Sequence, residues 1–256
     1  MKKFSISLSL VFLFLTLVSL DAHAQKRKVQ NLPGYDQAPY HFGFILGVNQ
    51  MLFTVKPVEN LSFKKWTGIQ SPDIFADSLF VYGVTSSPTP GFTIGILGNL
   101  RLGRYGDMRF IPSLSFGERL LNYSILAYDE GESQFIETSK SITTTLIDFP
   151  LEFRYKSKRL NNFRAYVLGG ASYTLDLASQ KKAEQNSNDV TVKINKNDLM
   201  LSAGVGFDFY TTYFKFGTQL KMSYGINNLM QYEGNLYTDS IESLRSKIFL
   251  LSFTFE

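Results

Sequence analysis

Cysteine is absent from all 256 residues of the chain. This absence excludes disulfides, thiol chemistry and a lipid anchor on an N-terminal cysteine. Histidine is almost absent, because the chain has only His23 and His41. Enzymes that use a nucleophile usually place a base beside it, and transition-metal sites usually need several nitrogen or sulfur ligands. We therefore expect no enzymatic activity, no catalytic residues, no metal site and no cofactor.

Long apolar runs are also lacking, with one exception at the N-terminus. Two lysines precede 17 uncharged residues, Phe4–Leu20, and small residues stand at Ala22 and Ala24. This is the pattern of a secretory signal peptide, here residues 1–24, with the mature chain starting near Gln25. A membrane anchor is the alternative, but the run is at the short end for a helix that crosses hydrocarbon.

Neither sign of charge is in large excess, because the net charge is only +4. The basic residues are scattered apart from Lys26–Lys28, so the sequence has no nucleic-acid-binding footprint. We expect these three residues to lie in a solvated periplasmic segment over residues 25–39. Export without a helical span leaves the periplasm, the exterior or the outer membrane as locations.

Aromatic residues are abundant, with 23 Phe and 14 Tyr, and the mean hydropathy of −0.05 indicates that apolar and polar residues are interleaved. In Val205–Phe209 every second residue is apolar, as on one face of a strand. Stretches of this kind recur eight times. They cover residues 40–48, 92–102, 108–121, 142–155, 163–175, 199–210, 213–226 and 247–255.

Short and long gaps alternate between these stretches. The long gaps, residues 49–90, 122–141, 177–198 and 227–246, are rich in Asn, Ser, Asp, Gly and Pro, as loops are. In outer-membrane barrels the short turns are periplasmic and the long loops extracellular. The sequence therefore predicts an all-β fold over residues 40–256, an eight-stranded antiparallel up-and-down transmembrane β-barrel with both termini in the periplasm. Pro112 predicts a bulge or break within one strand.

A soluble barrel with an apolar interior gives the same periodicity. Three features favour the outer membrane: the signal peptide, the dense Phe and Tyr on one face, and the Arg, Asp and Glu on the other. The chain also ends in an aromatic-rich strand, Phe253–Glu256, like the strands that barrel assembly machinery reads. We therefore expect outer-membrane lipid to surround the apolar face.

An eight-stranded barrel has an interior that side chains fill. We expect the inward charges to form an ion-pair network that plugs the lumen, with a proton or ion path as the alternative. These residues are Arg101, Arg109, Asp148, Glu152, Arg154, Arg164 and Lys215. Gly95–Gly98 and Gly204–Gly206 lie inside expected strands with no following helix, so they do not predict a dinucleotide or other small-molecule site.

The first long loop has 42 residues and many large apolar side chains. A loop of this length is usually functional or has structure of its own, so we expect a self-packed lid or a partner-binding surface. Its residues include Phe63, Trp66, Ile69, Ile74, Phe75, Leu79, Phe80 and Val81. In the second loop, Asp129–Glu132 is expected to be a solvated tip, with a bound calcium ion as the alternative.

Five segments carry a resemblance to a known family. They are Lys26–Pro33, His41–Asn49, Pro90–Leu102, Arg109–Arg119 and Asp148–Lys156. Together they resemble the PorT (SprT) family of Bacteroidetes outer-membrane barrels. The Pro-Gly-Phe of residues 90–92 and the Pro-Leu-x-x-Arg-Tyr of residues 150–155 are shared with the wider family of outer-membrane β-barrel domain proteins.

The resemblance implies a non-enzymatic component of the type IX secretion system, which also serves gliding motility where that occurs. Because a filled eight-stranded lumen cannot pass a polypeptide, an accessory role in docking or assembling other secretion proteins is expected. The alternative is a general small barrel for adhesion, host-factor binding or envelope stability. A barrel enzyme acting on lipids or peptides is a weaker third possibility.

Overall fold

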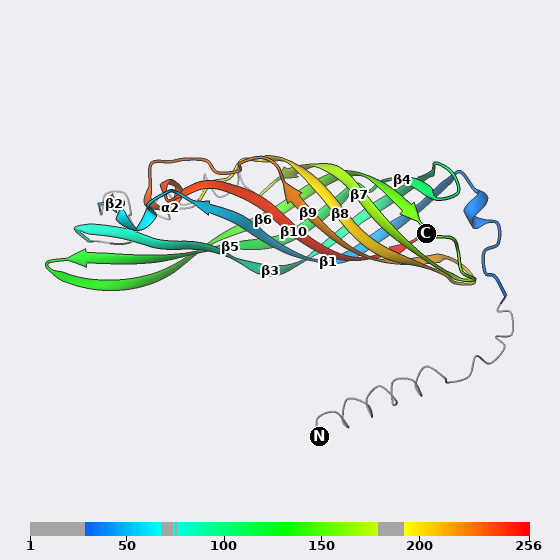
Figure 1. Ribbon diagram of the computed structural model, residues 1–256, viewed down its shortest axis with the longest axis horizontal. Coiled ribbons are helices and arrows are strands. Elements are labelled where there is room, and N and C mark those ends of the chain that lie inside the picture. Colours follow the sequence, from blue (N-terminus) through cyan, green and yellow to red (C-terminus); the bar gives the residue numbers. More distant parts are fainter. Residues whose placement is uncertain (1–28, 68–73, 75, 179–191) are drawn as a thin grey trace, which may run out of the picture.

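The computed structural model describes residues 29–67, 74, 76–178 and 192–256 (Figure 1). The signal peptide, Lys26–Lys28, Ile69 and Phe75 lie outside the described residues, and what the sequence indicates about them stays a prediction. No helix in the described part of the chain is long and apolar enough to cross a membrane.

Nearly all the described elements are strands. In chain order they are η1 (Tyr35–Gln37), β1 (Tyr40–Pro57), η2 (Leu61–Phe63), β2 (Lys65–Trp66), β3 (Ser78–Arg101), β4 (Gly106–Phe110), β5 (Ser113–Asp129), β6 (Glu132–Lys156), β7 (Phe163–Asp176), β8 (Asn197–Tyr210), β9 (Lys215–Gly225), α2 (Leu236–Asp239) and β10 (Ile241–Phe255).

The sheet closes on itself. Each long strand pairs antiparallel with its neighbour in the chain, and β1 pairs with both β3 and β10, as in the pairs Phe44↔Ile96 and Phe44↔Phe255. With β4 and β5 counted as one interrupted strand, the described residues form an eight-stranded ring, and β2 pairs with β3 outside it. The predicted up-and-down barrel is confirmed.

The break at Pro112 is also confirmed. Proline has no backbone N–H, so it cannot donate to the ladder, and β4 ends before it at Phe110. The register is the same on both sides of the break, because Gly98 pairs with Phe110 and Gly95 with Ser113. The wall therefore continues past Pro112 as one strand with a local interruption.

The predicted loops 49–90 and 122–141 are wrong over most of their length. β1 continues to Pro57, β3 begins at Ser78, and β5 and β6 meet in a tight turn at Glu130 and Gly131, both with positive φ. β6 has 25 residues, about 80 Å of extended chain, whereas about 9–11 residues cross a membrane. β1, β3, β5 and β6 are therefore much longer than a membrane crossing needs, and they run on toward the end of the barrel opposite the C-terminus (Figure 1).

Predicted loops 177–198 and 227–246 are closer to the structure. β8 begins at Asn197, and the second loop holds the single-turn helix α2 before β10. Asn235 caps α2, because its side-chain oxygen accepts from the backbone N–H of Thr238 at 2.8 Å. An isolated bridge between Ile194 and Met230 joins the two loops at the outer end.

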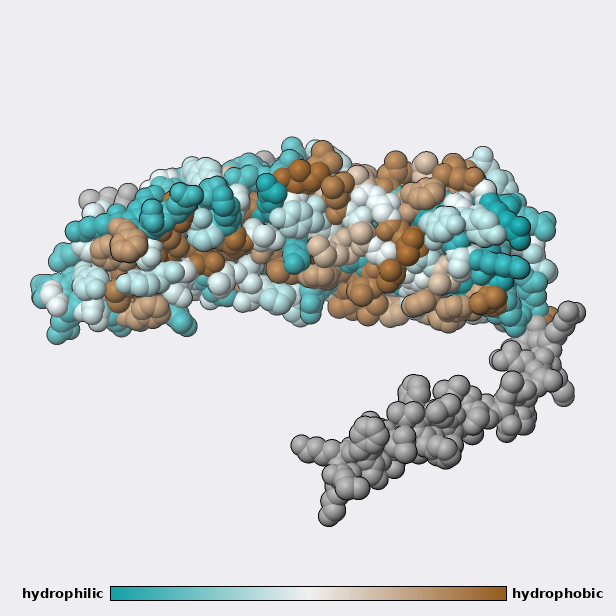
Figure 2. Space-filling view, in the orientation of Figure 1, coloured by the Kyte–Doolittle hydropathy of each residue, from teal (hydrophilic) through white to brown (hydrophobic). Residues whose placement is uncertain are grey.

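The polarity of the inward and outward faces is reversed between the two halves of the barrel. Near the termini, β6 points Leu151 and Phe153 outward and buries Glu152 and Arg154, whereas farther out it exposes Thr143 and buries Ile142. Figure 2 shows hydrophobic residues gathered on the wall toward the end that holds the C-terminus in Figure 1, with hydrophilic residues at that rim and over much of the opposite end. We call these the membrane half and the outer half.

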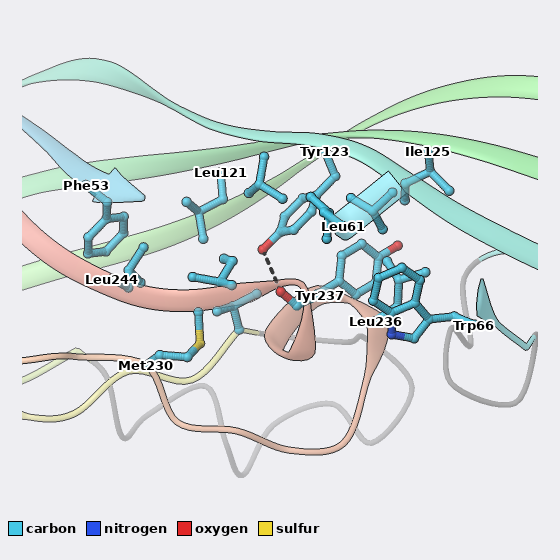
Figure 3. Packing of buried hydrophobic residues seen from close by; sticks show 14 of the residues in the cluster. Phe53, Leu61, Trp66, Leu121, Tyr123, Ile125, Met230, Leu236, Tyr237 and Leu244 are labelled. Atoms are coloured by element: carbon cyan, nitrogen blue, oxygen red, sulfur yellow. Dashed lines mark hydrogen bonds between the residues drawn. The ribbon is translucent and has the colours of Figure 1, made fainter. Parts of the chain in front are cut away.

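The outer half has an apolar core of its own, as in a soluble protein (Figure 3). Trp66 is 1% exposed and packs there, and the Tyr123 hydroxyl donates to the Tyr237 carbonyl at 3.1 Å. Burial raises the pKa of Tyr123, which keeps the hydroxyl protonated as a donor. The first loop is thus self-packed at Trp66, while Phe63 is 84% exposed.

Candidate functional site

Buried ion pairs fill the membrane half of the lumen. Arg154 Nη2 lies 2.7 Å from Asp208 Oδ2, and Lys221 Nζ lies 2.7 Å from Glu152 Oε1. Each of these side chains is at most one-tenth exposed. Alternation forces this arrangement, because the residues flanking them on the strands face lipid. Burying a charge is costly unless it is paired, so these contacts let a charged lumen exist.

The C-terminal residue closes this network. The side-chain carboxylate of Glu256 accepts from Arg109 and from Lys215, the latter at 2.8 Å, and the Tyr35 hydroxyl donates to it at 3.3 Å. Burial and the nearby Glu256 carboxylate raise the pKa of Tyr35, so its hydroxyl stays protonated and donates. The Glu256 carboxylate therefore links the end of the last strand to the N-terminal segment and to the charged residues of the lumen.

Most of the predicted lumen residues join the network, and two differ. Arg109, Glu152, Arg154 and Lys215 form the ion pairs above. Asp148 accepts instead from the hydroxyls of Thr174 at 2.7 Å and Ser115 at 3.2 Å. Arg101 lies at the rim, where it donates to the backbone carbonyls of Gly103 and Gln37, so its assignment to the ion-pair network is wrong.

The predicted ion-pair network leaves out several partners that the structure shows. They are Asp36, Asp107, Lys156, Asp208, Lys221 and Glu256. Asp208, Lys221 and Lys156 occupy inward positions in expected strands or at their ends, so alternation and charge could have found them. Asp36 could not have been found, because it lies before the first strand and reaches the barrel only through tertiary structure.

A glycine makes room for one stacked pair in the lumen. The Arg154 guanidinium lies 3.4 Å from the ring centroid of Tyr166, a close cation–π contact. A Cβ built on Gly206 would overlap the Tyr166 phenol. Gly206, which pairs with Tyr166 across β7 and β8, therefore has a steric role in the lumen.

Residues 31–39, which we call the clasp, cover the mouth of the barrel at the end where Glu256 lies. Asp36 accepts from Arg164 at 3.0 Å, from Arg159 at 3.4 Å and from the Tyr210 hydroxyl at 2.9 Å. His41 donates through Nε2 to the Tyr35 carbonyl at 2.8 Å and stacks on its ring. His41 is thus part of the contact between the clasp and the first strand.

The lumen is closed above the ionic layer. A cavity of about 30 Å³ lies among polar residues that include Asp148, Ser115 and Lys221, which is room for about one or two waters. Next to it, Met51, Leu146, Met200 and Ile248 pack as a buried apolar cluster, and the core of the outer half follows. Within the described residues we find no open channel through the barrel.

The acidic loop tip is solvated. Asp129, Glu130 and Glu132 are exposed at the β5–β6 turn, on the rim of an open cleft of about 610 Å³. In the part of the chain that the structure describes, no three His, Cys, Asp or Glu side chains come together as a metal site. The geometry of the described residues is that of a closed, packed barrel with structured surfaces at both ends.

A model of the family described as outer membrane protein beta-barrel domain matches residues 23–231. The chain belongs to this family. As a member of the outer membrane protein beta-barrel domain family, it is an outer-membrane protein, and lipid surrounds the apolar face of its membrane half. The family match ends before β10, so ring closure is seen in the pairing of β10 with β1.

Among solved structures, the chain is similar to the outer membrane protein OprG from Pseudomonas aeruginosa. The identity is 12% and the TM-score is 0.33, with 86% of this chain and 97% of that chain covered. No curated protein matches.

Proposed function

We propose that this outer-membrane barrel is a non-enzymatic accessory component of type IX protein secretion, and of gliding motility where that occurs. It acts by docking or assembling other secretion proteins and is not the conducting pore. The observation that carries the proposal is the closed lumen, in which ion pairs such as Arg154–Asp208 and an apolar layer around Met51 fill the space that a translocating chain would need.

The resemblance to the PorT family supports the secretion role. Its strand segments, residues 41–49, 90–102, 109–119 and 148–156, fall on β1, β3, β4–β5 and β6. These are consecutive strands of the ring, and they contribute the buried residues Arg109, Glu152 and Arg154. The resemblance therefore concerns a continuous part of the wall and the lumen behind it.

Docking surfaces are available on both sides of the membrane. The outer half rises beyond the bilayer on four long strands, and the clasp lies at the periplasmic mouth. Lys26–Lys28 precede the clasp in the sequence and add positive charge on the periplasmic side. A protein with structured surfaces at both ends and a closed interior is suited to connecting partners across the outer membrane.

Gene deletion tests the role. In a species with type IX secretion, we expect loss of the gene to abolish the appearance of cargo in the medium, and complementation with the wild-type gene to restore it. Unchanged cargo secretion would refute the proposal. Co-purification from detergent extracts followed by mass spectrometry then identifies the partners, and we expect other secretion proteins among them.

The second candidate function is adhesion or host-factor binding. The outer half favours it, because that half places exposed side chains such as Phe63 well beyond the bilayer. The same deletion strain separates the two functions: adhesion predicts normal cargo secretion together with altered binding of cells to surfaces.

A further inference from the structure

The β5–β6 hairpin reaches farther out than the rest of the barrel (Figure 1). β6 pairs with β5 from Glu132 onward, but its pairing with β7 begins only at Leu146↔Asp176. Among the described residues, the other edge of β6 therefore pairs with no strand before Leu146, and its outermost part is residues 132–139. We call this segment the free edge.

An unpaired strand edge presents a row of backbone N–H and C=O groups that another strand can pair with. Proteins usually protect such edges with proline, lysine or a bulge. The free edge contains neither proline nor lysine, and its register with β5 is unbroken from Ser113↔Asp148 to Asp129↔Glu132. The strand therefore stays regular and able to accept a neighbour along its whole exposed length.

The charges on residues 123–139 have one sign, and the ammonium of Lys140, the next residue, lies over the Tyr237 ring of the outer core. Residues 123–139 include four carboxylates and no lysine or arginine. They are Asp129, Glu130, Glu132 and Glu137, all exposed. A strand that pairs here meets a negative field, so a basic segment is favoured over an acidic one.

Aromatic side chains lie on the same hairpin face. Phe135 of the free edge is 55% exposed and contacts Tyr82, which is 56% exposed, with ring centroids 6.2 Å apart. Phe80 and Tyr128 form a second edge-to-face pair at 5.8 Å. A strand added beside β6 would place its alternate side chains next to Phe135, so apolar residues at those positions add contact area.

A second copy of the chain fits the edge poorly. Two copies in one membrane have the same orientation, so their β6 strands would run parallel, related by an axis along the strands. A rotation of 180° about that axis puts the outward face of one β6 strand on the same side of the joined sheet as the inward face of the other. The aromatic side chains of the two copies therefore lie on opposite sides of the sheet. A segment of a different protein has no such restriction.

We propose that the free edge binds an extended basic segment of a partner protein by strand addition, with alternate apolar side chains packed against Phe135. Backbone hydrogen bonds supply the pairing, and the carboxylates select the charge of the segment. This inference goes beyond the secretion role and holds whether or not the partner belongs to a secretion system.

Peptide binding to the full mature protein in lipid nanodiscs tests the pairing. The probe is an octapeptide of alternating lysine and valine with blocked ends. Two further versions carry N-methyl groups on alternate amides, one on the odd and one on the even positions. Because a strand uses every other amide toward one neighbour, we expect one version to bind as well as the parent peptide and the other to bind about tenfold or more weakly.

Charge reversal on the protein completes the test. We expect the Glu132→Lys/Glu137→Lys protein to bind the lysine–valine peptide about tenfold or more weakly and to bind a glutamate–valine peptide instead. The control is Glu59→Lys, which makes the same kind of charge change at an exposed outer turn residue and should leave binding unchanged. No binding to the wild-type protein, equal binding of both methylated peptides, or undiminished binding to the charge-reversed protein would overturn the proposal.

Discussion

At the residue scale, the membrane half depends on charges that are buried together with their partners. Arg154 and Asp208 are both essentially unexposed and lie 2.7 Å apart, and the Asp208 carboxylate also lies 4.0 Å from the Lys215 ammonium. Breaking such a pair leaves an uncompensated buried charge, which is far more costly than losing an exposed pair. The lumen residues are therefore expected to matter for stability through pairing.

Replacing Asp208 tests this dependence. We expect Asp208→Asn to destabilise the barrel by about 3–5 kcal/mol, because Arg154 keeps its charge in the lumen without Asp208. Urea unfolding in lipid vesicles measures the change. The control is Glu242→Gln, which removes an exposed pair with Lys56 and should cost about 0–1 kcal/mol. Equal effects of the two substitutions would contradict the account of the lumen.

Two glycines in paired strands give a steric comparison. We expect Gly206→Ala to destabilise by about 1–3 kcal/mol, because the added Cβ meets the Tyr166 phenol and displaces it from Arg154. Gly169→Ala should be nearly neutral, since the nearest atom to its Cβ is 3.9 Å away. The same unfolding assay compares them, and a neutral Gly206→Ala would show that the stacked pair has room to shift.

At the element scale, the alternation of side chains predicted the strands of the membrane half. It did not predict that the same strands continue through the outer half. The stretch 122–141 has four serines, one threonine and one asparagine among its 20 residues, which resembles loop composition when the apolar face is assumed to point outward. In the outer half the apolar face points inward, so polar residues such as Thr143 are the exposed ones. The clasp was missed for a different reason, because the contacts that hold Asp36 are with Arg159, Arg164 and Tyr210, which are all distant in sequence.

Arginine substitutions on one strand test the reversal of faces. We expect Leu151→Arg to cost about 2–4 kcal/mol and to reduce the folded protein in the outer membrane, because this outward side chain faces lipid. Thr143→Arg, eight residues away and also outward, should be tolerated because water surrounds it. Heat-dependent migration on gels reports the folded fraction. A tolerated Leu151→Arg would place the lipid boundary elsewhere.

At the scale of the whole molecule, the protein is a closed barrel with two interiors. A polar interior suits the lipid-embedded half, and an apolar core suits the half that stands in water, so one continuous wall meets both solvents. Among the described residues, the ion pairs of the membrane half and the apolar core of the outer half close the lumen from the clasp outward. The molecule is thereby shaped to hold partners and not to conduct.

Conductance measurements address this directly. In planar bilayers, we expect the purified full-length mature protein to produce no stable current steps, because the layer of Met51, Leu146, Met200 and Ile248 excludes hydrated ions. A porin inserted under the same conditions serves as the positive control. Reproducible ohmic steps from the purified protein would show that an open path exists.

The position of the boundary between the two halves is the central claim, and a cysteine scan along the outward face of β6 tests it best. The chain has no cysteine, so each single substitution gives an unambiguous signal. A membrane-impermeant maleimide added to intact cells should label cysteines at Glu137, Ser139 and Thr143 and leave those at Phe149, Leu151 and Phe153 unlabelled. Labelling that continues through residues 149–153, or that is absent at residues 137–143, would contradict the division into a membrane half and an outer half.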